Sequence, residues 1–423
     1  MKKIINAFSI VVVSLFALAV FGWMSVHISK GDKDFGFANE PIKFMYSFLD
    51  QFKETVKEVE KMSPTFLKTA PNHNSVNKLK NDLRILSTYS SSDNQRTVAI
   101  RNLKNDSIEY EWELADKVKP HDRVLNPIFY PNMDLVYSIH HVTGLRRIDA
   151  EGNILWKQDS VLSHHSTNLD AEGNIWICAS MAPLWEANGK YKLNGREVYF
   201  QDDYITQIDA NNGQILFHKS VAEILKENQM ASYLLHTQSG TDPMHINDIQ
   251  PAFKTTQYYN IGDLFISLKQ ISLIFQYRPS TNEVIRALKG PFSAQHDVDF
   301  LNDSTLTWFN NNYYALWTED SKPKPKNADQ IPLTGDFFSN ITQYNLSTGE
   351  YSVIDEDLFR KRWIFSGNEG LHEFINDSTY FVEQQNSGYL WVIQNGEVVY
   401  KNVFPSQHEG YHHLPNWNRI IKE

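Results

Sequence analysis

Hydrophobic and polar residues follow three different patterns along this chain of 423 residues. Residues 7–26, AFSIVVVSLFALAVFGWMSV, contain no charged side chain and are long enough to cross a bilayer as one helix. Residues 40–62 place apolar side chains at helical spacing with charges between them, which predicts a short amphipathic helix that ends at Pro64. From about residue 80 onwards, short alternating runs between turn sequences predict β-strands.

The turn sequences of the strand-rich region recur in two kinds. One kind follows a strand that begins near a histidine, as in NDSTLTW from residue 302. The other kind closes a unit as strand, Asp/Asn-Gly turn and strand, as in DAEGNILW from residue 149. Pairing the two kinds gives six units, near residues 81–116, 124–158, 162–220, 244–291, 295–355 and 363–402. Sheet units of roughly 40–50 residues indicate a propeller, so we expect an all-β, six-bladed β-propeller.

These patterns divide the chain into an N-terminal transmembrane anchor, a linker that contains the amphipathic helix, and the propeller domain: residues 1–30, 31–79 and 80–423. Two longer stretches within the propeller, 185–203 and 319–332, are expected to be surface loops. A cleavable signal is the alternative for the anchor, because Ala17-Leu18-Ala19 resembles a cleavage site. The apolar run continues beyond Ala19, which favours a retained anchor.

The charges at the start of the chain predict its orientation. Lys2 and Lys3 precede the apolar run, and positive charge favours the cytoplasmic side of a membrane. We therefore expect a single-pass protein of the cell inner membrane, with the propeller domain on the periplasmic side.

Composition excludes several classes of protein. The formal net charge of -10, without any basic run, argues against a nucleic-acid-binding protein. With one cysteine, Cys178, the chain has no internal disulfide and no thiolate metal cluster. Cys178 lies in the apolar run GNIWICAS, so we expect it in the core. No glycine-rich phosphate-binding loop is present in the sequence.

Four of the predicted units begin with a histidine: His165, His245, His296 and His372. His165 and His296 each lie seven residues before a turn acid, and His372 lies five before one, which keeps the same strand face. Because the inner strands of a propeller line its channel, we expect these rings to meet in one pocket. Three more histidines are expected at its edge: His140, His141 and His164. Singly, each is explained by packing at a strand end; four in register indicate a shared site.

Two chemistries suit such a pocket. Four imidazoles around a channel can hold iron or zinc. Alternatively, one histidine is a nucleophile and the others serve as acid, base and oxyanion donors. Asn247, two residues after His245, offers an amide donor, and Lys269 offers a cation from the next strand. A cation and an amide donor suit an anionic group and oppose a metal ion.

Four blocks of this sequence resemble the bacterial arylsulfotransferases that work without the nucleotide sulfate donor PAPS. The blocks are HHSTNLDAEGNIW (164–176), DPMHINDIQPAF (242–253), DLFISLKQISLIFQY (263–277) and QHDVDFLNDSTLTWFNN (295–311). The resemblance runs from about residue 125 to 420. It implies a six-bladed propeller that moves a sulfuryl group from a phenolic sulfate ester to a phenol, in a ping-pong reaction through a covalent histidine and without a cofactor.

The resemblance also implies a role for individual residues. His296 matches the histidine that becomes sulfated. His245 and Asn247 match the His-x-Asn pair that binds the sulfate oxygens and assists proton transfer. His165 matches a further active-site histidine. Lys269 stands where the family usually has arginine, so it keeps the charge but loses the fork that grips two oxygens.

His164 and His372 are expected to contact the substrate. The implied partners are a small aryl sulfate donor and a phenolic acceptor, together with the membrane through the N-terminal helix, while the oligomeric state stays open. Two alternatives remain at this point. One is a propeller that only binds a ligand, which the change to Lys269 favours, and the other is a metal-dependent enzyme with a ring of histidines.

Overall fold

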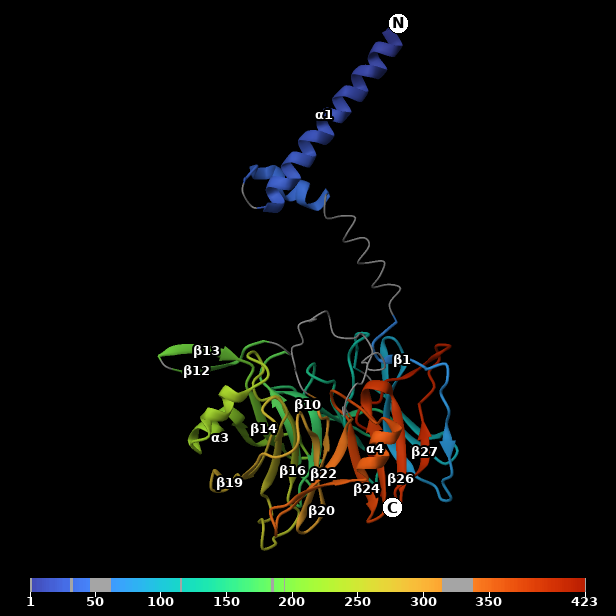
Figure 1. The fold of residues 1–423 in the computed structure, drawn as a ribbon, viewed down its shortest axis with the longest axis vertical. Coiled ribbons are helices and arrows are strands. Elements are labelled where there is room, and N and C mark those ends of the chain that lie inside the picture. The colour runs from blue at the N-terminus through green and yellow to red at the C-terminus, as the bar shows by residue number, and fades with distance from the viewer. Residues whose placement is uncertain are drawn as a thin grey trace. The chain divides into compact units, whose positions relative to one another are not determined.

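The computed structural model describes residues 2–30, 33–45, 62–114, 116–183, 186–193, 195–313 and 338–422. The chain divides into two compact units, Met1–Met62 and Ser63–Glu423, and each is considered by itself (Figure 1).

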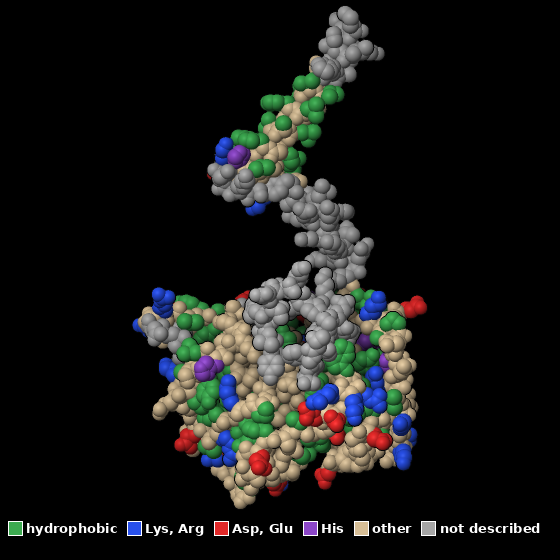
Figure 2. All heavy atoms as spheres, viewed as in Figure 1, with side chains coloured by type: hydrophobic (Ala, Val, Ile, Leu, Met, Phe, Trp, Pro, Cys, Tyr) green, Lys and Arg blue, Asp and Glu red, His purple; other side chains and the backbone are tan. Residues whose placement is uncertain are grey.

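The first unit consists mainly of the helix α1 (Lys2–Lys30), followed by the short helix η1 (Gly36–Ala38). Within α1, Ser9–Ile28 is long and apolar enough to cross a membrane, and its apolar side chains are exposed along the helix (Figure 2). Length and composition fit a transmembrane span and a signal sequence equally. Of the segment expected to form an amphipathic helix, the structure shows a helix over residues 39–45. The rest of the segment, residues 46–61, lies outside the described residues.

The second unit contains six antiparallel sheets arranged as the blades of a propeller, which confirms the predicted fold (Figure 1). Blade 1 has the strand order β29 (Arg419–Ile420), β3 (Arg84–Ser92), β4 (Gln95–Asn102) and β5 (Ser107–Glu113). Blade 2 has β6 (Ile128–Phe129), β7 (Leu135–Tyr137), β8 (Leu145–Ile148) and β9 (Ile154–Gln158). Blade 3 has β10 (Leu162–Leu169), β11 (Ile175–Ser180), β14 (Asp203–Ile208) and β15 (Ile215–Ser220).

The remaining blades repeat this arrangement. Blade 4 has β16 (Ile246–Pro251), β17 (Leu264–Leu268), β18 (Leu273–Arg278) and β19 (Glu283–Leu288). Blade 5 has β20 (His296–Asn302), β21 (Thr305–Asn310), β22 (Asn340–Asn345) and β23 (Tyr351–Ile354). Blade 6 has β24 (Leu371–Asn376), β25 (Thr379–Gln384), β26 (Tyr389–Gln394), β27 (Glu397–Asn402) and, at its outer edge, β2 (Val76–Asn77).

Smaller elements decorate the blades. They are the sheet of β1 (Phe66–Lys68) with β28 (Tyr411–His413), the hairpin of β12 (Gly189–Leu193) with β13 (Arg196–Phe200), and the short helices α3 (Val221–Glu227), η2 (Ala231–His236), α4 (Glu356–Arg362) and η4 (Gln385–Ser387). The hairpin corrects the expectation that 185–203 is a loop, since its two strands pair along their length. The other expected loop, 319–332, lies outside the described residues.

The recurring turns have a local cause. In the turn between β20 and β21, the side-chain oxygen of Asn302 accepts a hydrogen bond from the backbone N–H of Ser304 at 3.0 Å. Asn376 does the same for Ser378 at 3.1 Å in blade 6. Asparagine side chains favour turns for this reason, because they replace a backbone acceptor two residues ahead. The repeat visible in the sequence is therefore a repeat of turn chemistry.

The apolar core lies between neighbouring blades. Blades 3 and 4, for example, bury Ile205, Ile249 and Phe275 against each other, together with Cys178 as predicted. The first strand in each order faces the propeller axis, and residues from all six of these strands line one central cavity.

The ring is closed by a strand from the far end of the propeller sequence. β29 pairs antiparallel with β3, with Arg419 opposite Leu86. The buried carboxylate of Glu383 accepts backbone N–H bonds from Trp417 and Asn418, at 3.0 and 2.8 Å, and so holds the approach to β29. The first sequence unit thus supplies three strands of its blade.

Candidate active site

The heads of three inner strands bring three of the predicted histidines together. His165 lies in β10, His245 directly precedes β16, and His296 is the first residue of β20. The ring of His165 lies 4.9 Å from that of His245 and 6.2 Å from that of His296, measured between centroids. These rings form one cluster near the axis of the propeller.

The backbone departs from regular strand geometry at each of these heads. The register of the inner strand shifts between His164 and Thr167, between Ile246 and Asp248, and between His296 and Val298. His165 and His245 adopt left-handed backbone angles, with φ of 54° and 49°. Such angles are uncommon for residues other than glycine and gather at functional sites. Side-chain direction at the heads therefore does not follow the simple alternation of a strand.

Hydrogen bonds around His296 fix the protonation of its ring. Asn311 donates its Nδ2 to the carbonyl oxygens of Ser366 and Glu369, at 2.7 and 2.6 Å, so its Oδ1 is left as an acceptor. This Oδ1 lies 2.7 Å from His296 Nδ1, and the carbonyl oxygen of Ala294 lies 3.1 Å from the same nitrogen. With acceptors on both sides, Nδ1 must carry the proton. The lone pair of the ring is consequently on Nε2.

His296 Nε2 has no hydrogen-bond partner among the described residues, and the His296 side chain is completely buried. Burial, helped by the positive charge of Lys269, lowers the pKa of His296 well below its ordinary value. The ring is therefore neutral at physiological pH. A neutral imidazole with one unengaged, unprotonated nitrogen is suited to nucleophilic attack.

Beside this ring stands a pair formed by Asp242 and His245. The Asp242 carboxylate, which is fully buried, bonds to His245 Nδ1. Burial alone would raise the pKa of Asp242, but the hydrogen bond from His245 and the positive charge of the ring hold that pKa below its usual value. A carboxylate on one ring nitrogen orients the imidazole and stabilises its charged form. His245 is thus equipped to give and take a proton at Nε2.

Asn247 and Lys269 contact the same region. Asn247 is fully buried and donates Nδ2 to the carbonyl oxygen of Gln295 at 2.7 Å, while its Oδ1 has no hydrogen-bond partner among the described residues. This bond holds the peptide that leads into His296. The Lys269 ammonium donates to Asn368 Oδ1 at 2.8 Å, and its backbone N–H bonds to the carbonyl oxygen of His245 at 3.1 Å.

The histidines expected at the edge of the pocket continue the cluster of rings. His164 and His165 lie with their Nδ1 atoms 2.8 Å apart, and His164 Nε2 lies 3.5 Å from the Asp203 carboxylate. His141 stacks on His164 with 4.5 Å between ring centroids. His140 contacts the ring of His165 at 5.1 Å. Burial lowers the pKa of His140 and His165 well below the ordinary value and that of His141 to about 2.

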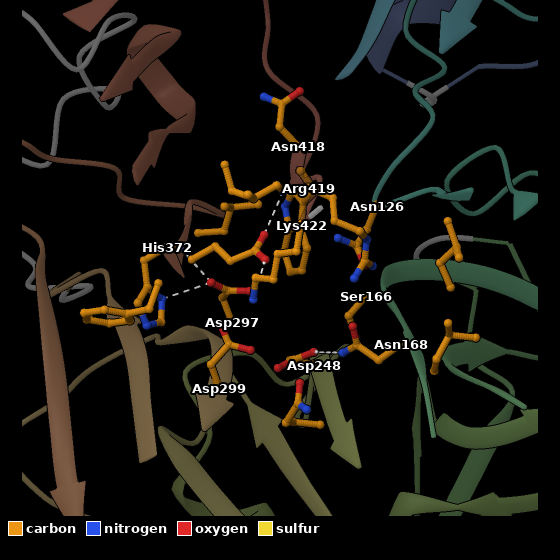
Figure 3. Close-up of a pocket in the computed structure, with 18 of the residues that line it drawn as sticks. Asn126, Ser166, Asn168, Asp248, Asp297, Asp299, His372, Asn418, Arg419 and Lys422 are labelled. Carbon is orange, nitrogen blue, oxygen red and sulfur yellow. Dashed lines mark hydrogen bonds and ion pairs between the residues drawn. The ribbon is translucent and has the colours of Figure 1, made fainter. Parts of the chain in front are cut away.

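His372 lies deeper in the channel, where its ring is held by neighbours in blade 5. Nδ1 bonds to the Asp297 carboxylate at 3.0 Å (Figure 3). Nε2 bonds to the Thr307 hydroxyl at 2.8 Å. Both ring nitrogens are thus already engaged. The ring contacts Phe374, and the cluster that contains His296 does not include it.

Below the histidines, a central cavity of about 420 Å³ continues along the axis. Figure 3 shows its acidic wall, which includes Asp248, Asp297 and Asp299, with Arg419 from the closing strand. Burial raises the pKa of Asp248 to about 6 and that of Asp297 and Asp299 well above the usual value. Trp417 lines this cavity and also lies 6.1 Å from the ring of His296.

Two groups of described residues bring metal-ligand atoms within 4.8 Å of one another. The groups are His140 with His141 and His165, and Asp297 with Asp299 and His372. Together with the contacts described above, the site contains the unengaged Nε2 of His296, the ring of His245 oriented by Asp242, and the cation of Lys269.

Sequence reasoning missed three residues that shape this site. No role was predicted from the sequence for Asn311, Trp417 or Asp242. The position of Asn311 could have been inferred from the sequence. When β20 folds back on β21 at the 302–304 turn, Asn311 comes to lie beside Ala294 and His296. No comparable signal exists for Trp417, which reaches the axis through the closure of the ring.

The sequence matches a model of a known protein family. The family model described as Arylsulfotransferase (ASST) matches residues 135–404, which is more than half of the chain. No curated protein matches the chain.

Two of the solved structures that match the chain have low sequence identity to it and low structural similarity. A protein of unknown function from Bacteroides caccae is 12% identical with a TM-score of 0.49, over 81% of this chain and 100% of that one. A streptogramin B lyase is 13% identical with a TM-score of 0.42, over 85% and 99%. At these values the likeness carries no information about function.

The family match confirms the resemblance that the four sequence blocks indicated. It supports aryl sulfotransferase activity in general, with small aryl molecules as donor and acceptor. The chain therefore belongs to the arylsulfotransferase (ASST) family.

Proposed function

We propose that the protein transfers a sulfuryl group from a phenolic sulfate ester to a phenol through a sulfohistidine formed on Nε2 of His296. The observation that carries this proposal is the bond from His296 Nδ1 to Asn311, which leaves Nε2 unprotonated and without a partner. A nucleophile of this kind needs no further activation at neutral pH.

In the first half-reaction, the lone pair of His296 Nε2 attacks the sulfur of the donor. The N–S bond forms while the bond from sulfur to the phenolic oxygen breaks, and the phenolic oxygen leaves with the electron pair. His245, whose ring is oriented by its bond to Asp242, donates the proton that this oxygen takes up. Asn311 and the carbonyl oxygen of Ala294 stabilise the positive charge that the sulfated ring carries at Nδ1–H.

In the second half-reaction, the same groups work in reverse. The neutral ring of His245 takes the proton of the acceptor phenol, whose oxygen attacks sulfur. The N–S bond then breaks, its electron pair returns to Nε2, and His296 is neutral again. The proton carried by His245 is available for the next donor.

Charge stabilisation is the main task in such a transfer. The sulfuryl group passes through a loosely bonded, SO3-like state, comparable with phosphoryl transfer, in which positioning and electrostatics dominate. Lys269 supplies the positive charge, and its effect on the pKa of His296 shows that the two side chains are coupled. Asn247 keeps the His296 peptide in place and retains one Nδ2 hydrogen for a sulfuryl oxygen.

The alternatives predict different contacts. A metal-dependent ring of four histidines requires His372 to offer a free nitrogen, whereas Asp297 and Thr307 occupy both. A propeller that only binds a ligand does not require the tautomer of His296 to be fixed. His372 stays a prediction as a substrate contact, through the cavity below the cluster.

Labelling of the protein tests the proposal. Incubation with 4-nitrophenyl sulfate and no acceptor is expected to release one equivalent of 4-nitrophenol and to leave one sulfuryl group on the chain, visible by intact mass. His296→Ala is expected to abolish both the label and turnover. His218→Asn, on the outer strand β15, is the matched control and is expected to retain both. A label that persists in His296→Ala contradicts the proposal.

We also propose that α1 is retained as an anchor and that the propeller lies on the periplasmic side of the inner membrane. Lys2 and Lys3 before the apolar segment support this orientation. Protease added to intact spheroplasts is expected to degrade the propeller. Full protection would mean the opposite orientation, and a shortened mature N-terminus would mean a cleaved signal.

A further inference from the structure

Four of the histidines in the cluster belong to two neighbouring segments at blades 2 and 3. His140 and His141 follow β7, and His164 and His165 belong to β10. The ring centroids of His140 and His141 are 4.4 Å apart, and those of His140 and His165 are 5.1 Å apart. The sulfuryl-transfer mechanism uses neither His140 nor His141, so the presence of these two residues calls for a separate explanation.

Two ring nitrogens in this group are buried without a hydrogen bond. Nδ1 of His140 and Nδ1 of His141 have no hydrogen-bond partner among the described residues. The exposed fraction of His141 is 8%. Buried polar atoms nearly always have a partner, so each exception requires a cause, and an unrecorded ion is one. These unpartnered nitrogens are therefore an observation that points to a ligand.

The positions of the nitrogens fit one ion. His140, His141 and His165 each offer a ring nitrogen within 4.8 Å of the other two. A Zn–N bond is about 2.0–2.1 Å long, so nitrogens around one ion are at most about 4.2 Å apart. Binding of one ion therefore requires the three rings to rotate until their nitrogens lie within this shorter distance of one another. Neutral imidazole is the ligand that zinc, copper and nickel prefer, and burial keeps these rings neutral.

The surroundings suit a cation despite a nearby arginine. Arg123 is paired with Glu369 through two hydrogen bonds of 2.9 and 2.7 Å, so its charge is compensated. His164 holds Nδ1 of His165 at 2.8 Å and lies 3.5 Å from the Asp203 carboxylate. A ligand ring that is linked in this way to a carboxylate is typical of metal sites.

We propose that His140, His141 and His165 form a site for one divalent transition-metal ion such as Zn²⁺, and that the bound ion inhibits sulfuryl transfer by withdrawing His165 from the cluster with His245 and His296. The binding site stands on the geometry alone. The inhibition rests on the proposed function, because it requires that the transfer takes place beside His165. The ion is an inhibitor in this scheme and takes no part in the reaction.

Direct binding tests the site without reference to activity. The full chain, free of any histidine tag and dialysed against EDTA, is titrated with ZnCl2 by calorimetry and with CoCl2 by visible absorption. One ion per chain is expected, with the Co²⁺ band of a four-coordinate site. His140→Gln and His141→Asn are each expected to weaken binding at least tenfold. Asparagine is chosen because His141 has a left-handed φ of 56°, which asparagine tolerates.

His218→Asn is the control for general histidine content and is expected to bind as the wild type does. Equal affinity of the wild type and both site variants, or no binding at all, overturns the site. Having two variants at different positions protects the test against one of them failing to fold, which circular dichroism reveals.

Turnover of 4-nitrophenyl sulfate tests the inhibition. Zn²⁺ is expected to inhibit the wild type, and EDTA to restore it, while His141→Asn keeps its metal-free activity and resists Zn²⁺ at least tenfold better. Binding without inhibition overturns the second half of the proposal. A metal-free protein that shows no sulfuryl transfer contradicts the proposed function, and the calorimetric result then still decides the site.

Discussion

Asn311 Oδ1 lies 2.7 Å from His296 Nδ1 and, together with the carbonyl oxygen of Ala294 at 3.1 Å, it keeps the proton on that nitrogen and the lone pair on Nε2. The amide cannot turn over to offer its Nδ2 instead, because Nδ2 already donates to two carbonyl oxygens. Asn311 is therefore itself held by the backbone of Ser366 and Glu369, which precede the inner strand of the neighbouring blade 6.

Replacement of this acceptor is expected to slow the formation of the sulfohistidine. Asn311→Leu removes the closer of the two acceptors and leaves only the carbonyl oxygen of Ala294, so Nδ1 holds its proton less firmly. A loss in kcat of up to about 10³–10⁴ is expected, the upper bound being the loss for a triad histidine held in the wrong tautomer. Asn311→Asp keeps an acceptor and is expected to lose far less. The burst of 4-nitrophenol measures the first step directly. Equal bursts from Asn311→Leu and the wild type would contradict the role.

Replacement of Asp242 is expected to impair both halves of the reaction. Asp242→Asn leaves His245 without the carboxylate that stabilises its charged ring, and a loss of about 10²–10³ is expected in each half-reaction, as is usual for a proton carrier. Rapid-quench measurements of labelling, and of transfer from labelled protein to phenol, separate the two. A defect confined to one half-reaction would show that His245 serves only one oxygen.

Lys269 distinguishes a working enzyme from one that only binds its ligand. Lys269→Ala removes the cation, and a loss of about 10²–10³ in kcat/KM is expected, comparable with losing one oxyanion donor. Lys269→Arg restores a fork that can hold two sulfuryl oxygens and is expected to keep or raise the rate. Unchanged kinetics in both variants would mean that the charge has no part in the transfer.

The buried histidines are expected to make the fold sensitive to acid. The pKa of His141 is lowered to about 2 by burial and then by His164, so the unfolded chain binds a proton below about pH 6.5 that the folded chain does not. Stability is therefore lost as the pH falls below this value. Without His141, the free energy of unfolding is expected to fall by up to about 2 kcal/mol less between pH 6.5 and 4.5 than it does in the wild type.

Urea unfolding of the wild type and of His141→Asn at several pH values measures this difference. Buried acids such as Asp248 and Glu383, whose pKa values rise to about 6 and about 8, titrate in the opposite sense. They are present in both proteins, so they cancel in the comparison. Parallel stability curves for the two proteins would contradict the assignment of a buried neutral ring.

Much of the fold was predictable because the same short turn sequences recur in successive blades and form through contacts between residues close in sequence. The asparagine turns at 302 and 376 act within three residues, so they are visible in the sequence without knowledge of the partner strands. The closing strand β29 was not predictable, because a strand of two residues has no alternation to recognise. The hairpin of β12 and β13, by contrast, had a signal in the sequence, the Asn-Gly pair at positions 194 and 195.

The site was predictable in its residue types and less so in its geometry. Spacing alone pointed to His165, His245 and His296, which the structure gathers. The expectation for His372 depended on strict alternation along the strand. That alternation fails at the heads, since β20 shifts register between His296 and Val298, and Asp297 takes a left-handed φ of 59°. Contacts such as that of Asn311 depend on the pairing of strands, which spacing does not encode.

The closure of the ring by β29 also sets an order in time. The outer strands β3, β4 and β5 of blade 1 are synthesised before the inner strands of the other five blades, and they have no inner neighbour until β29 follows. Trp417, beside His296, arrives in the same late stretch. A ribosome that stalls before residue 416 would therefore release five complete blades around an unfinished pocket. Sulfuryl transfer would begin only once synthesis has passed β29, so the fold makes completion of the pocket a late event in synthesis.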